Sequence, residues 1–329
     1  MDKDINIAIA LNDKVIIPAY VMVRSIAVNH VSQSFCIYVL YSELEEDYRQ
    51  MLIQAANYGN ADHNVEFIEV DACKTQGLPF NQFWSVETYY RLMLPEILGD
   101  KIERILYLDI DIVVNKNILD FYNTDFEDKL FIVTKDVECE NILALDDSQA
   151  RKRNAYFREL RNDGMVYFCA GVLLMNLKKL KERYTFDKYM EIFESLRDRI
   201  ELLDQDLLNF THYKEVKFVD ETKYGLFTQT AHENGMTYEE AKNNVSILHF
   251  TGKAKPWTIN LIRYDIEKIW WEYAKDSPFY QELLERVFYQ SMESHFAEDK
   301  LQELMKENQE LKEMLGKCQA LIQKLSSGI

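Results

Sequence analysis

The sequence is poor in glycine and proline, with 10 glycines and 5 prolines among 329 residues. So few residues of these two types exclude a loop-rich, collagen-like or other fibrous protein. Hydrophobic residues make up 47% of the chain, which excludes global disorder and is enough for a large core. The length fits about two domains, or one large α/β domain with an appendage.

Cysteine is also scarce, and long apolar runs are absent. The five cysteines are an odd number, none lies close to another, and no Cys-x-x-Cys motif occurs. This spacing argues against a disulfide framework and against a zinc ribbon. No uncharged run approaches the ~18 residues of a membrane span, and residues 1–9 lack the apolar run of a signal peptide. The sequence therefore predicts a reduced, soluble, cytoplasmic protein without a transmembrane segment.

Basic residues are outnumbered, because 38 Lys and Arg stand against 55 Asp and Glu, and the formal charge is −17. This balance argues against nucleic acid as a partner, since phosphate binding needs clustered Lys and Arg. It also disfavours adhesion to an anionic membrane surface. A diphosphate would likewise be repelled by such a chain unless a cation bridged the two.

Short apolar runs alternate with helical patterns in the first half of the chain. Strands are expected at 5–11, 35–41, 65–70 and 104–110, and helices at 18–29, 43–58 and 88–98. This βαβαβ rhythm predicts an α/β fold with a mostly parallel sheet and helices on both faces. Ligands of such sheets bind beyond the carboxyl ends of the strands. The second half is more mixed, with strands expected at 130–134, 166–175 and 246–250, and helices at 180–203 and 264–289.

The composition changes after Phe296, where one stripe of residues recurs at spacings of three and four. Its members are Leu301, Leu304, Asn308, Leu311, Leu315, Cys318, Ile322 and Leu325. A two-in-seven stripe is narrower than a globular face needs and is typical of a coiled-coil seam. Asn308 at an a position favours a parallel dimer, and a helix lying against its own domain is the alternative. We therefore predict a catalytic domain in 1–262, a helical segment in 263–295 and a coiled-coil oligomerisation helix in 296–326.

Two aspartates follow an apolar strand in the segment LYLDIDIVV, namely Asp109 and Asp111. The period of two in a strand puts both carboxylates on one side. Two hard oxygen ligands at the carboxyl edge of a sheet suit Mg²⁺ or Mn²⁺ and, through the metal, a diphosphate. Aspartate pairs at strand ends are also common as turn formers or caps, so the motif needs further support.

The segment ILHFTGKAKPW places His249 at the end of a late strand, followed by Gly252 and Lys255. A neutral imidazole can complete a carboxylate site and favours Mn²⁺ over Mg²⁺. Gly252 permits close backbone approach, and Lys255 can reach phosphate oxygens. A single histidine is more often an ordinary core or surface residue, and this alternative remains open from the residues alone.

Two further segments are ambiguous when they are taken alone. In LLDQDLLN, Asp204 and Gln205 open a helical run, where an aspartate is either an N-cap or a ligand of sugar hydroxyls. The segment YFCAGVLLMN, which contains Cys169, has the composition of an ordinary core strand.

Five segments, in the order SVETYYRL, LYLDIDIVV, FCAGVLLMNL, LDQDLLN and LHFTGKAKPW, resemble those of glycosyltransferase family 8 over about residues 5–260. The likeness is to lipooligosaccharide α-galactosyltransferases and, more distantly, to glycogenin. It implies a GT-A fold, a UDP-hexose donor, Mn²⁺ with Mg²⁺ as the alternative, and retention of anomeric configuration. A glucose or galactose would then move to a saccharide or glycoprotein acceptor in an α-linkage.

The resemblance also implies roles for individual residues. The metal ligands would be Asp109, Asp111 and His249, and the catalytic residues would be Gln205 and Asp204. The two aspartates of the metal site would also contact the donor. The other donor contacts would be Ala10, Asn12, Lys14, Arg91, Ile110, Asp136, Cys169, Ala170, Gly252 and Lys255. Relatives usually carry an asparagine at the position of Cys169, and its amide would bind the donor sugar.

Retention requires either a nucleophile beneath the sugar or attack from the face that the leaving group occupies. The neutral amide of Gln205 is a poor nucleophile, which favours same-face attack, while a covalent role for Asp204 or Asp206 stays open. Two other functions are considered. A metal-dependent phosphohydrolase is disfavoured because the aspartate pair lies on the fourth strand and is followed by Ile112 and Val113. The other is a catalytically weak scaffolding subunit whose coiled coil assembles a glycosylation complex.

Overall fold

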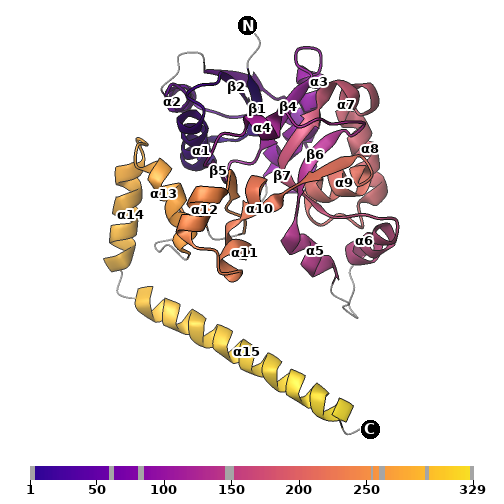
Figure 1. The fold of residues 1–329 in the computed structure, drawn as a ribbon, viewed down its shortest axis with the longest axis vertical. Helices are drawn as coiled ribbons and strands as arrows, with labels where there is room; N and C mark the ends of the chain where they lie inside the picture. Colours follow the sequence, from indigo (N-terminus) through magenta and orange to yellow (C-terminus); the bar gives the residue numbers. More distant parts are fainter. Residues whose placement is uncertain are drawn as a thin grey trace. The chain divides into compact units, whose positions relative to one another are not determined.

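The computed structural model describes residues 4–58, 63–80, 85–144, 152–252, 255–258, 264–292 and 296–326. The chain divides into two compact units, the first formed by Met1–Thr258 and Ile262–Pro278 and the second by Ile259–Leu261 and Phe279–Ile329. Figure 1 shows the elements of both. The domain boundaries expected from the sequence, at 262–263 and at 295, lie outside the described residues.

The first unit is built on a seven-stranded sheet with the order β3-β2-β1-β4-β7-β6-β8. The strands are β1 Ile5–Ala10, β2 Phe35–Tyr41, β3 Asn64–Glu69, β4 Arg104–Leu108, β6 Phe131–Lys135, β7 Phe168–Asn176 and β8 Val216–Val219. Only β7 runs antiparallel to its neighbours, β4 and β6, among the strand pairs that the described residues form in this sheet. The expectation of a mostly parallel sheet is therefore confirmed.

A smaller sheet brings a late segment of the chain back to the aspartate pair. Its order is β5-β10-β9, with β5 Ile112–Val114, β10 Ile247–His249 and β9 Leu226–Phe227. Strand β10 runs antiparallel to β5, and the register sets His249 opposite Ile112. The histidine therefore lies next to the residue that directly follows Asp111.

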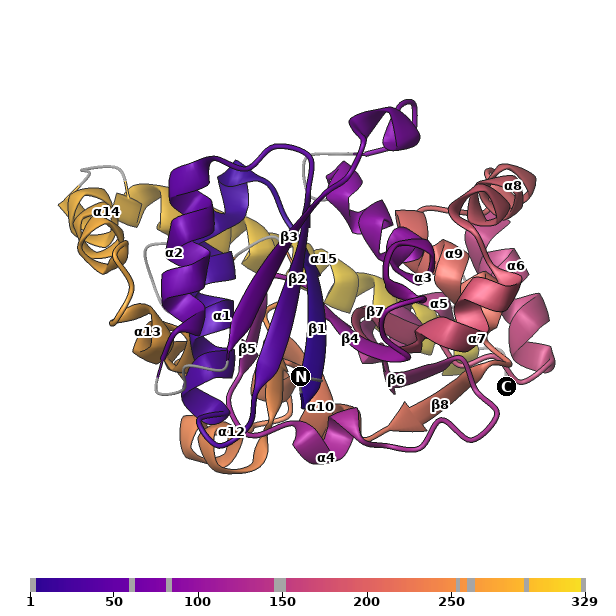
Figure 2. The ribbon, with the colours of Figure 1, turned by 90° about the horizontal axis from the view of Figure 1, so that it is seen from above.

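Helices cover both faces of the large sheet, as the sequence predicted (Figure 2). On one face lie α1 Ile16–Asn29 and α2 Glu46–Ala56, and α13 Lys268–Ala274 packs on α1. On the other lie α3 Leu94–Leu98, α7 Leu177–Arg183, α8 Phe186–Leu196 and α9 Leu203–His212. The core between the sheet and this second group of helices contains every second residue of the strands, such as Ala8 and Ala10 of β1 and Ile105 and Tyr107 of β4. This pattern arises because neighbouring side chains of a strand point to opposite faces of the sheet.

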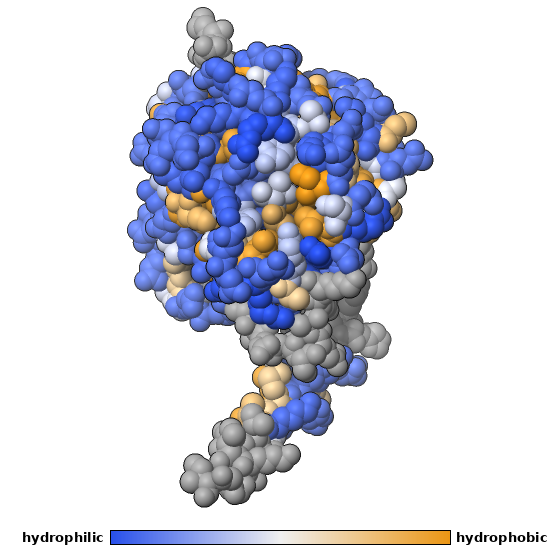
Figure 3. Space-filling model, turned by 90° about the vertical axis from the view of Figure 1, so that its right-hand side faces the viewer, coloured by the Kyte–Doolittle hydropathy of each residue, from blue (hydrophilic) through white to orange (hydrophobic). Residues whose placement is uncertain are grey.

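Shorter helices connect these layers. They are α4 Leu119–Tyr122, α5 Val137–Ala144, α6 Lys152–Asn162, α10 Glu221–Tyr224, α11 Thr228–Glu233 and α12 Tyr238–Asn244. Four 3-10 segments are Asp13–Val15, Ala72–Thr75, Val86–Met93 and Asp265–Glu267. Figure 3 shows one face of the molecule, on which apolar side chains gather near the centre and hydrophilic side chains surround them.

Three helices expected from the sequence are interrupted. The run 180–203 divides into the end of α7, the whole of α8 and a turn before α9, because the Thr185 side chain caps α8 by accepting a hydrogen bond from the Lys188 amide. The run 88–98 is a 3-10 segment followed by α3, which has a proline in its first turn. The run 264–289 is a 3-10 turn, α13 and α14 Tyr280–Met292.

The second unit contains α14 and the 31-residue helix α15 Phe296–Ser326. The leucines of the stripe that the structure describes in α15 are exposed. The exposed fractions are 53% for Leu301, 50% for Leu304, 65% for Leu311 and 60% for Leu315. Among the described residues, every helix is too short or too polar to cross a membrane.

Candidate active site

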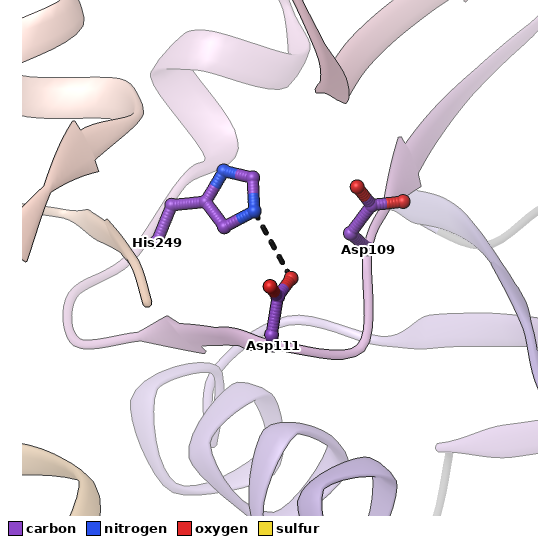
Figure 4. A group of neighbouring side chains, drawn as sticks. All are labelled: Asp109, Asp111 and His249. Atoms are coloured by element: carbon purple, nitrogen blue, oxygen red, sulfur yellow. Dashed lines mark hydrogen bonds and ion pairs between the residues drawn. The ribbon is translucent and has the colours of Figure 1, made fainter. Parts of the chain in front are cut away.

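Three potential metal ligands converge where the two sheets meet. Asp109 directly follows β4, Asp111 directly precedes β5, and His249 ends β10. One ligand atom from each of the three lies within 4.8 Å of the others, and Figure 4 shows the side chains turned toward a common centre. Carboxylate oxygens with one imidazole nitrogen form a ligand set that suits a divalent cation such as Mn²⁺. The residues that the sequence singled out as metal ligands are thus brought together.

His249 bridges two elements through its two ring nitrogens. Its Nε2 lies 3.0 Å from Asp111 Oδ1, and its Nδ1 lies 3.6 Å from the sulfur of Cys169. Burial lowers the pKa of His249, but Asp111 and then Cys169 outweigh burial and hold it well above its usual range. The ion pair therefore keeps Nε2 at the position that faces Asp111.

The loop after β10 places a cation on the second oxygen of the same carboxylate. Lys255 Nζ lies 2.6 Å from Asp111 Oδ2 and also donates to the Phe250 carbonyl at 2.7 Å. Although burial acts against ionisation, Lys255 and His249 hold the pKa of Asp111 well below its usual range. Gly252 has a left-handed φ of +84°, and no atom of the residues that the structure describes lies within 4 Å of the position that a Cβ would take. It therefore permits the turn and leaves room beside the site.

Strand β7 packs its backbone directly behind the metal ligands. The Asp109 amide donates to the Gly171 carbonyl at 2.9 Å. A Cβ at Gly171 would lie 2.5 Å from His249 Cε1 and 2.7 Å from Asp109 Oδ2, so only glycine fits. No role was expected for Gly171 from the sequence. A glycine inside a buried apolar strand is the signal that could have found it, because such glycines often mark a close approach.

Cys169 lies on the same strand, two residues before Gly171. Its sulfur is buried, accepts a hydrogen bond from the Gly171 amide at 3.3 Å and faces Nδ1 of His249. The resemblance implied that this position contacts the donor sugar. In the structure the sulfur lies behind the imidazole ring, on the side away from Asp111.

Arg91 links the metal ligands to the helix that carries the predicted catalytic residues. Its Nη1 lies 3.2 Å from Asp109 Oδ1 and donates to the Ala170 carbonyl. Its Nε lies 2.6 Å from Asp204 Oδ2, and its guanidinium stacks 4.5 Å over the Tyr107 ring. The buried cation thus holds two carboxylates at fixed positions.

Asp204 lies in the first turn of α9 and is buried. Burial raises the pKa of Asp204 to about 6; Arg91 opposes this rise and Asp109 adds to it. The preceding residue, Leu203, has a left-handed φ of +49°, which is rare for a residue with a branched side chain. Such local strain is typical of functional turns, where the surroundings force it.

Gln205 follows Asp204 and is held at both ends of its amide. Its Oε1 accepts from the Ala170 amide at 3.0 Å, and its Nε2 donates to Asp136 Oδ2 at 3.2 Å. Asp136 follows β6, and its Oδ1 accepts from the Cys139 amide at 2.8 Å in the first turn of α5. Burial raises the pKa of Asp136. The predicted donor residues Asp136 and Ala170 and the predicted catalytic residue Gln205 are therefore in direct contact.

Both carboxylate oxygens of Asp206 accept hydrogen bonds from protein groups. The donors are Arg153 Nε at 2.9 and 2.8 Å, the Tyr167 hydroxyl at 2.6 Å, and the amides of Glu201 and Leu202, each at 2.8 Å. A carboxylate with this many donors positions the turn before α9 and is a poor nucleophile. The role of Arg153 could not be predicted, since nothing near it in the sequence indicates that its partner is Asp206, 53 residues further along the chain.

The remaining predicted contacts lie at the end of β1 and between the two aspartates. Ala10 is the last residue of β1, and Asn12 donates to Glu87 Oε1 at 3.0 Å. Asn12 also accepts from the Lys14 amide, and the side chain of Lys14 is exposed. Glu87 belongs to the 3-10 segment that carries Arg91, so this group is joined to the site. Ile110 is half-buried in the turn between the aspartates.

The amino-acid sequence of the chain matches a known protein family. Residues 6–260 match Glycosyl transferase family 8. The chain is 25% identical over 260 residues to a lipopolysaccharide 1,2-glucosyltransferase of Escherichia coli, covering 77% of this chain and 73% of that protein. It is 24% identical over 257 residues to a lipopolysaccharide 1,3-galactosyltransferase of Salmonella typhimurium, covering 77% and 72%.

Solved structures show the same similarity. The galactosyltransferase LgtC, in complex with donor and acceptor sugar analogues, superposes with a TM-score of 0.67 and 25% identity, over 83% of this chain and 96% of that chain. An active-site mutant of LgtC, in which a glutamine is replaced by glutamate, gives a TM-score of 0.68 at 25% identity, over 82% and 95%.

Proposed function

The chain belongs to glycosyltransferase family 8 and has its GT-A fold, and we propose that it moves a glucose or galactose from UDP to a saccharide or glycoprotein acceptor. The new bond would be an α-linkage, formed with retention of configuration. One observation carries this proposal, namely the convergence of Asp109, Asp111 and His249 next to the buried group of Arg91 and Asp204. The curated relatives named above, which transfer glucose or galactose, support a hexose as the transferred sugar.

Asp109, Asp111 and His249 would hold Mn²⁺, with Mg²⁺ as the alternative. The bound cation would supply positive charge for a donor diphosphate, which the acidic chain otherwise repels. Lys255 reaches Asp111 from the loop after β10, and its ammonium group would turn to a phosphate oxygen when the donor binds. The space that the described residues leave beside Gly252 would admit that phosphate.

The donor sugar would lie against Asp136, Ala170 and Gln205. The amide of Gln205 is neutral and hydrogen-bonded at both ends, which supports positioning of the sugar over covalent catalysis. Asp204 is buried against Arg91, which favours a role as acceptor for a sugar hydroxyl. Same-face attack, with the leaving phosphate taking the proton of the acceptor, agrees best with these two side chains. The active-site glutamine of LgtC supports a role for Gln205.

The nucleotide would lie beyond the carboxyl end of β1. Ala10 would let the base approach the strand, and Asn12 and Lys14 would contact the uracil and ribose. Asn12 already holds Glu87 of the 3-10 segment that carries Arg91, so the nucleotide and sugar contacts would share one rigid support.

The C-terminal helix α15 would join two copies of the chain in a coiled coil. Its four leucines between residues 301 and 315 are exposed, and the sequence carries the heptad spacing of a dimer seam. In this organisation residues 1–262 catalyse, residues 263–295 connect, and residues 296–326 assemble the dimer. The cytoplasmic location expected from the sequence stays a prediction.

A donor screen with purified protein tests the proposed activity. UDP release is measured with UDP-glucose and with UDP-galactose, in Mn²⁺, in Mg²⁺ and in EDTA, with and without saccharide acceptors. We expect slow UDP release that depends on metal and on the sugar, and faster release with a suitable acceptor. A phosphohydrolase would instead release phosphate or UMP. A scaffolding subunit would release nothing from either donor, which would overturn the proposal.

A further inference from the structure

We propose that Cys169 is a positioning residue for His249, whose Nδ1–H donates to the sulfur so that Nε2 faces Asp109 and Asp111. The inference rests on the proposed function, because it requires His249 to be a metal ligand. It assigns Cys169 to the support of the metal centre and not to recognition of the donor sugar.

The orientation of the ring is fixed from several sides. Nδ1 lies 3.6 Å from the sulfur, and Nε2 lies 3.0 Å from Asp111 Oδ1. The ring of Phe227 meets the imidazole edge to face at 5.5 Å between centroids. The position occupied by the absent side chain of Gly171 lies 2.5 Å from His249 Cε1. A flip of the imidazole would therefore exchange both polar contacts within a closely packed space.

The sulfur itself is held in place. It is buried, and it accepts a second hydrogen bond from the Gly171 amide at 3.3 Å, from the same strand. Because β7 is a central strand of the large sheet, the acceptor cannot move without the sheet. Such rigid support is what orients a metal ligand to a fraction of an ångström.

The chemistry of imidazole explains why Nδ1 needs an acceptor. A histidine that binds a metal through Nε2 has no proton on that nitrogen, so the hydrogen of the neutral ring lies on Nδ1. The protonated ring carries a hydrogen on Nδ1 as well. Metal-bound histidines usually donate this hydrogen to a carboxylate or a carbonyl, and loss of such a partner typically weakens metal affinity 10- to 100-fold. Here a thiol sulfur takes that place, without adding a third carboxylate to the site.

The test compares three variants by their affinity for Mn²⁺, measured from free Mn²⁺ by electron paramagnetic resonance, and by their melting temperature without metal. Cys169→Val keeps a buried apolar side chain but removes the acceptor, and we expect about tenfold weaker Mn²⁺ binding. Cys169→Ser retains an acceptor, and we expect affinity within about threefold of the unmodified protein. The matched control is Cys36→Val, which changes a buried cysteine of β2 whose sulfur also accepts a hydrogen bond, from Asn64. This control should leave Mn²⁺ affinity unchanged.

Wild-type affinity in Cys169→Val would overturn the inference, as would a Cys169→Ser protein that binds Mn²⁺ as weakly as the valine variant. Equal losses of affinity in Cys169→Val and Cys36→Val would show general destabilisation and would overturn it too. If the valine variant does not fold, Cys169→Ala takes its place in the same comparison. A wild-type protein that binds neither Mn²⁺ nor Mg²⁺ would instead overturn the proposed metal dependence itself.

Discussion

Arg91 Nε lies 2.6 Å from Asp204 Oδ2, and the two side chains are 4% and 3% exposed. The hydrogen on this nitrogen points to the Thr88 carbonyl at 2.9 Å, so Asp204 Oδ2 gains a nearby charge but no aligned hydrogen bond from the described residues. A buried carboxylate oxygen without a donor costs stability.

The first prediction concerns stability and pH at Asp204. Its pKa is about 6 in the folded protein, above the ordinary value of 3.8. Between these values the folded protein binds more protons than the unfolded chain, so the free energy of unfolding should fall as pH rises from about 4 to 6. Asp204→Asn should remove this dependence and be more stable at pH 7.5 by roughly 1–3 kcal/mol. Urea unfolding at pH 4, 5 and 7.5 measures both effects.

The same variant should transfer sugar poorly, because a hydrogen bond to a charged acceptor is lost. We expect kcat/KM to fall by about ten- to a hundredfold. A stabilised Asp204→Asn protein with normal activity would show that this carboxylate does not touch the substrate. An unchanged pH dependence of stability would show that another group titrates in that range.

The second prediction tests the metal ligands. Asp109→Ala or Asp111→Ala should reduce turnover on the order of a hundredfold or more, because the charge that stabilises the leaving diphosphate would be lost. Activity should also vanish in EDTA and return best with Mn²⁺. The exposed Asp47 of α2 provides the control, since Asp47→Ala should leave activity unchanged. Full activity in a chelator would refute the metal requirement.

The third prediction follows from the close approach at Gly171. A methyl group there would displace His249 or Asp109, since its carbon would lie within 2.7 Å of both side chains. Gly171→Ala should weaken Mn²⁺ binding about tenfold or more. Gly225→Ala is the matched control, because its methyl group would meet Thr134 Oγ1 at 2.6 Å, away from the metal ligands. It should lower the melting temperature without changing Mn²⁺ affinity, and an equal loss of affinity in both variants would contradict the prediction.

Much of the fold could be predicted because the strands of the first half are apolar runs bounded by clear helical patterns. Strand β2 occupies the residues expected, and β1, β3 and β4 differ only at their ends. The place of β7 between β4 and β6 could not be predicted, because the apolar pattern of a strand does not indicate which strands pair with it. Its antiparallel direction is also the reason that Cys169 and Gly171 reach the metal ligands.

The active site likewise contains residues that could be predicted from the sequence and contacts that could not. Asp109, Asp111 and His249 could be found because each lies at or directly beside the end of a strand in a recognisable segment. The contacts of Arg153 with Asp206, and of the Cys169 sulfur with His249, depend on side-chain orientation in three dimensions. Strand alternation gives the face on which a side chain lies but not the atom that it meets.

The last prediction concerns α15, and it depends on the register of the proposed coiled coil. In a parallel dimer Asn308 would pair with its own copy at an a position, and Glu307 at g would meet Lys312 at e of the partner helix. An antiparallel dimer would match none of these pairs. Deletion of residues 297–329 should therefore give a monomer that still uses the UDP-sugar, because every proposed donor contact precedes this helix. Light scattering and the UDP-release assay measure the two properties.

Cys318 reports the register directly, because it occupies a d position of the seam and is a free, exposed cysteine. In a parallel, in-register dimer the two Cys318 side chains would face each other at a separation that a disulfide can span. Mild oxidation should then convert the chain to a covalent dimer on a non-reducing gel. Cys318→Ser should abolish the dimer band, whereas Cys73→Ser, which removes the other exposed cysteine, should retain it. A full-length chain that is monomeric at micromolar concentration would refute the coiled coil, and a dimer that resists oxidation at Cys318 would refute the parallel register.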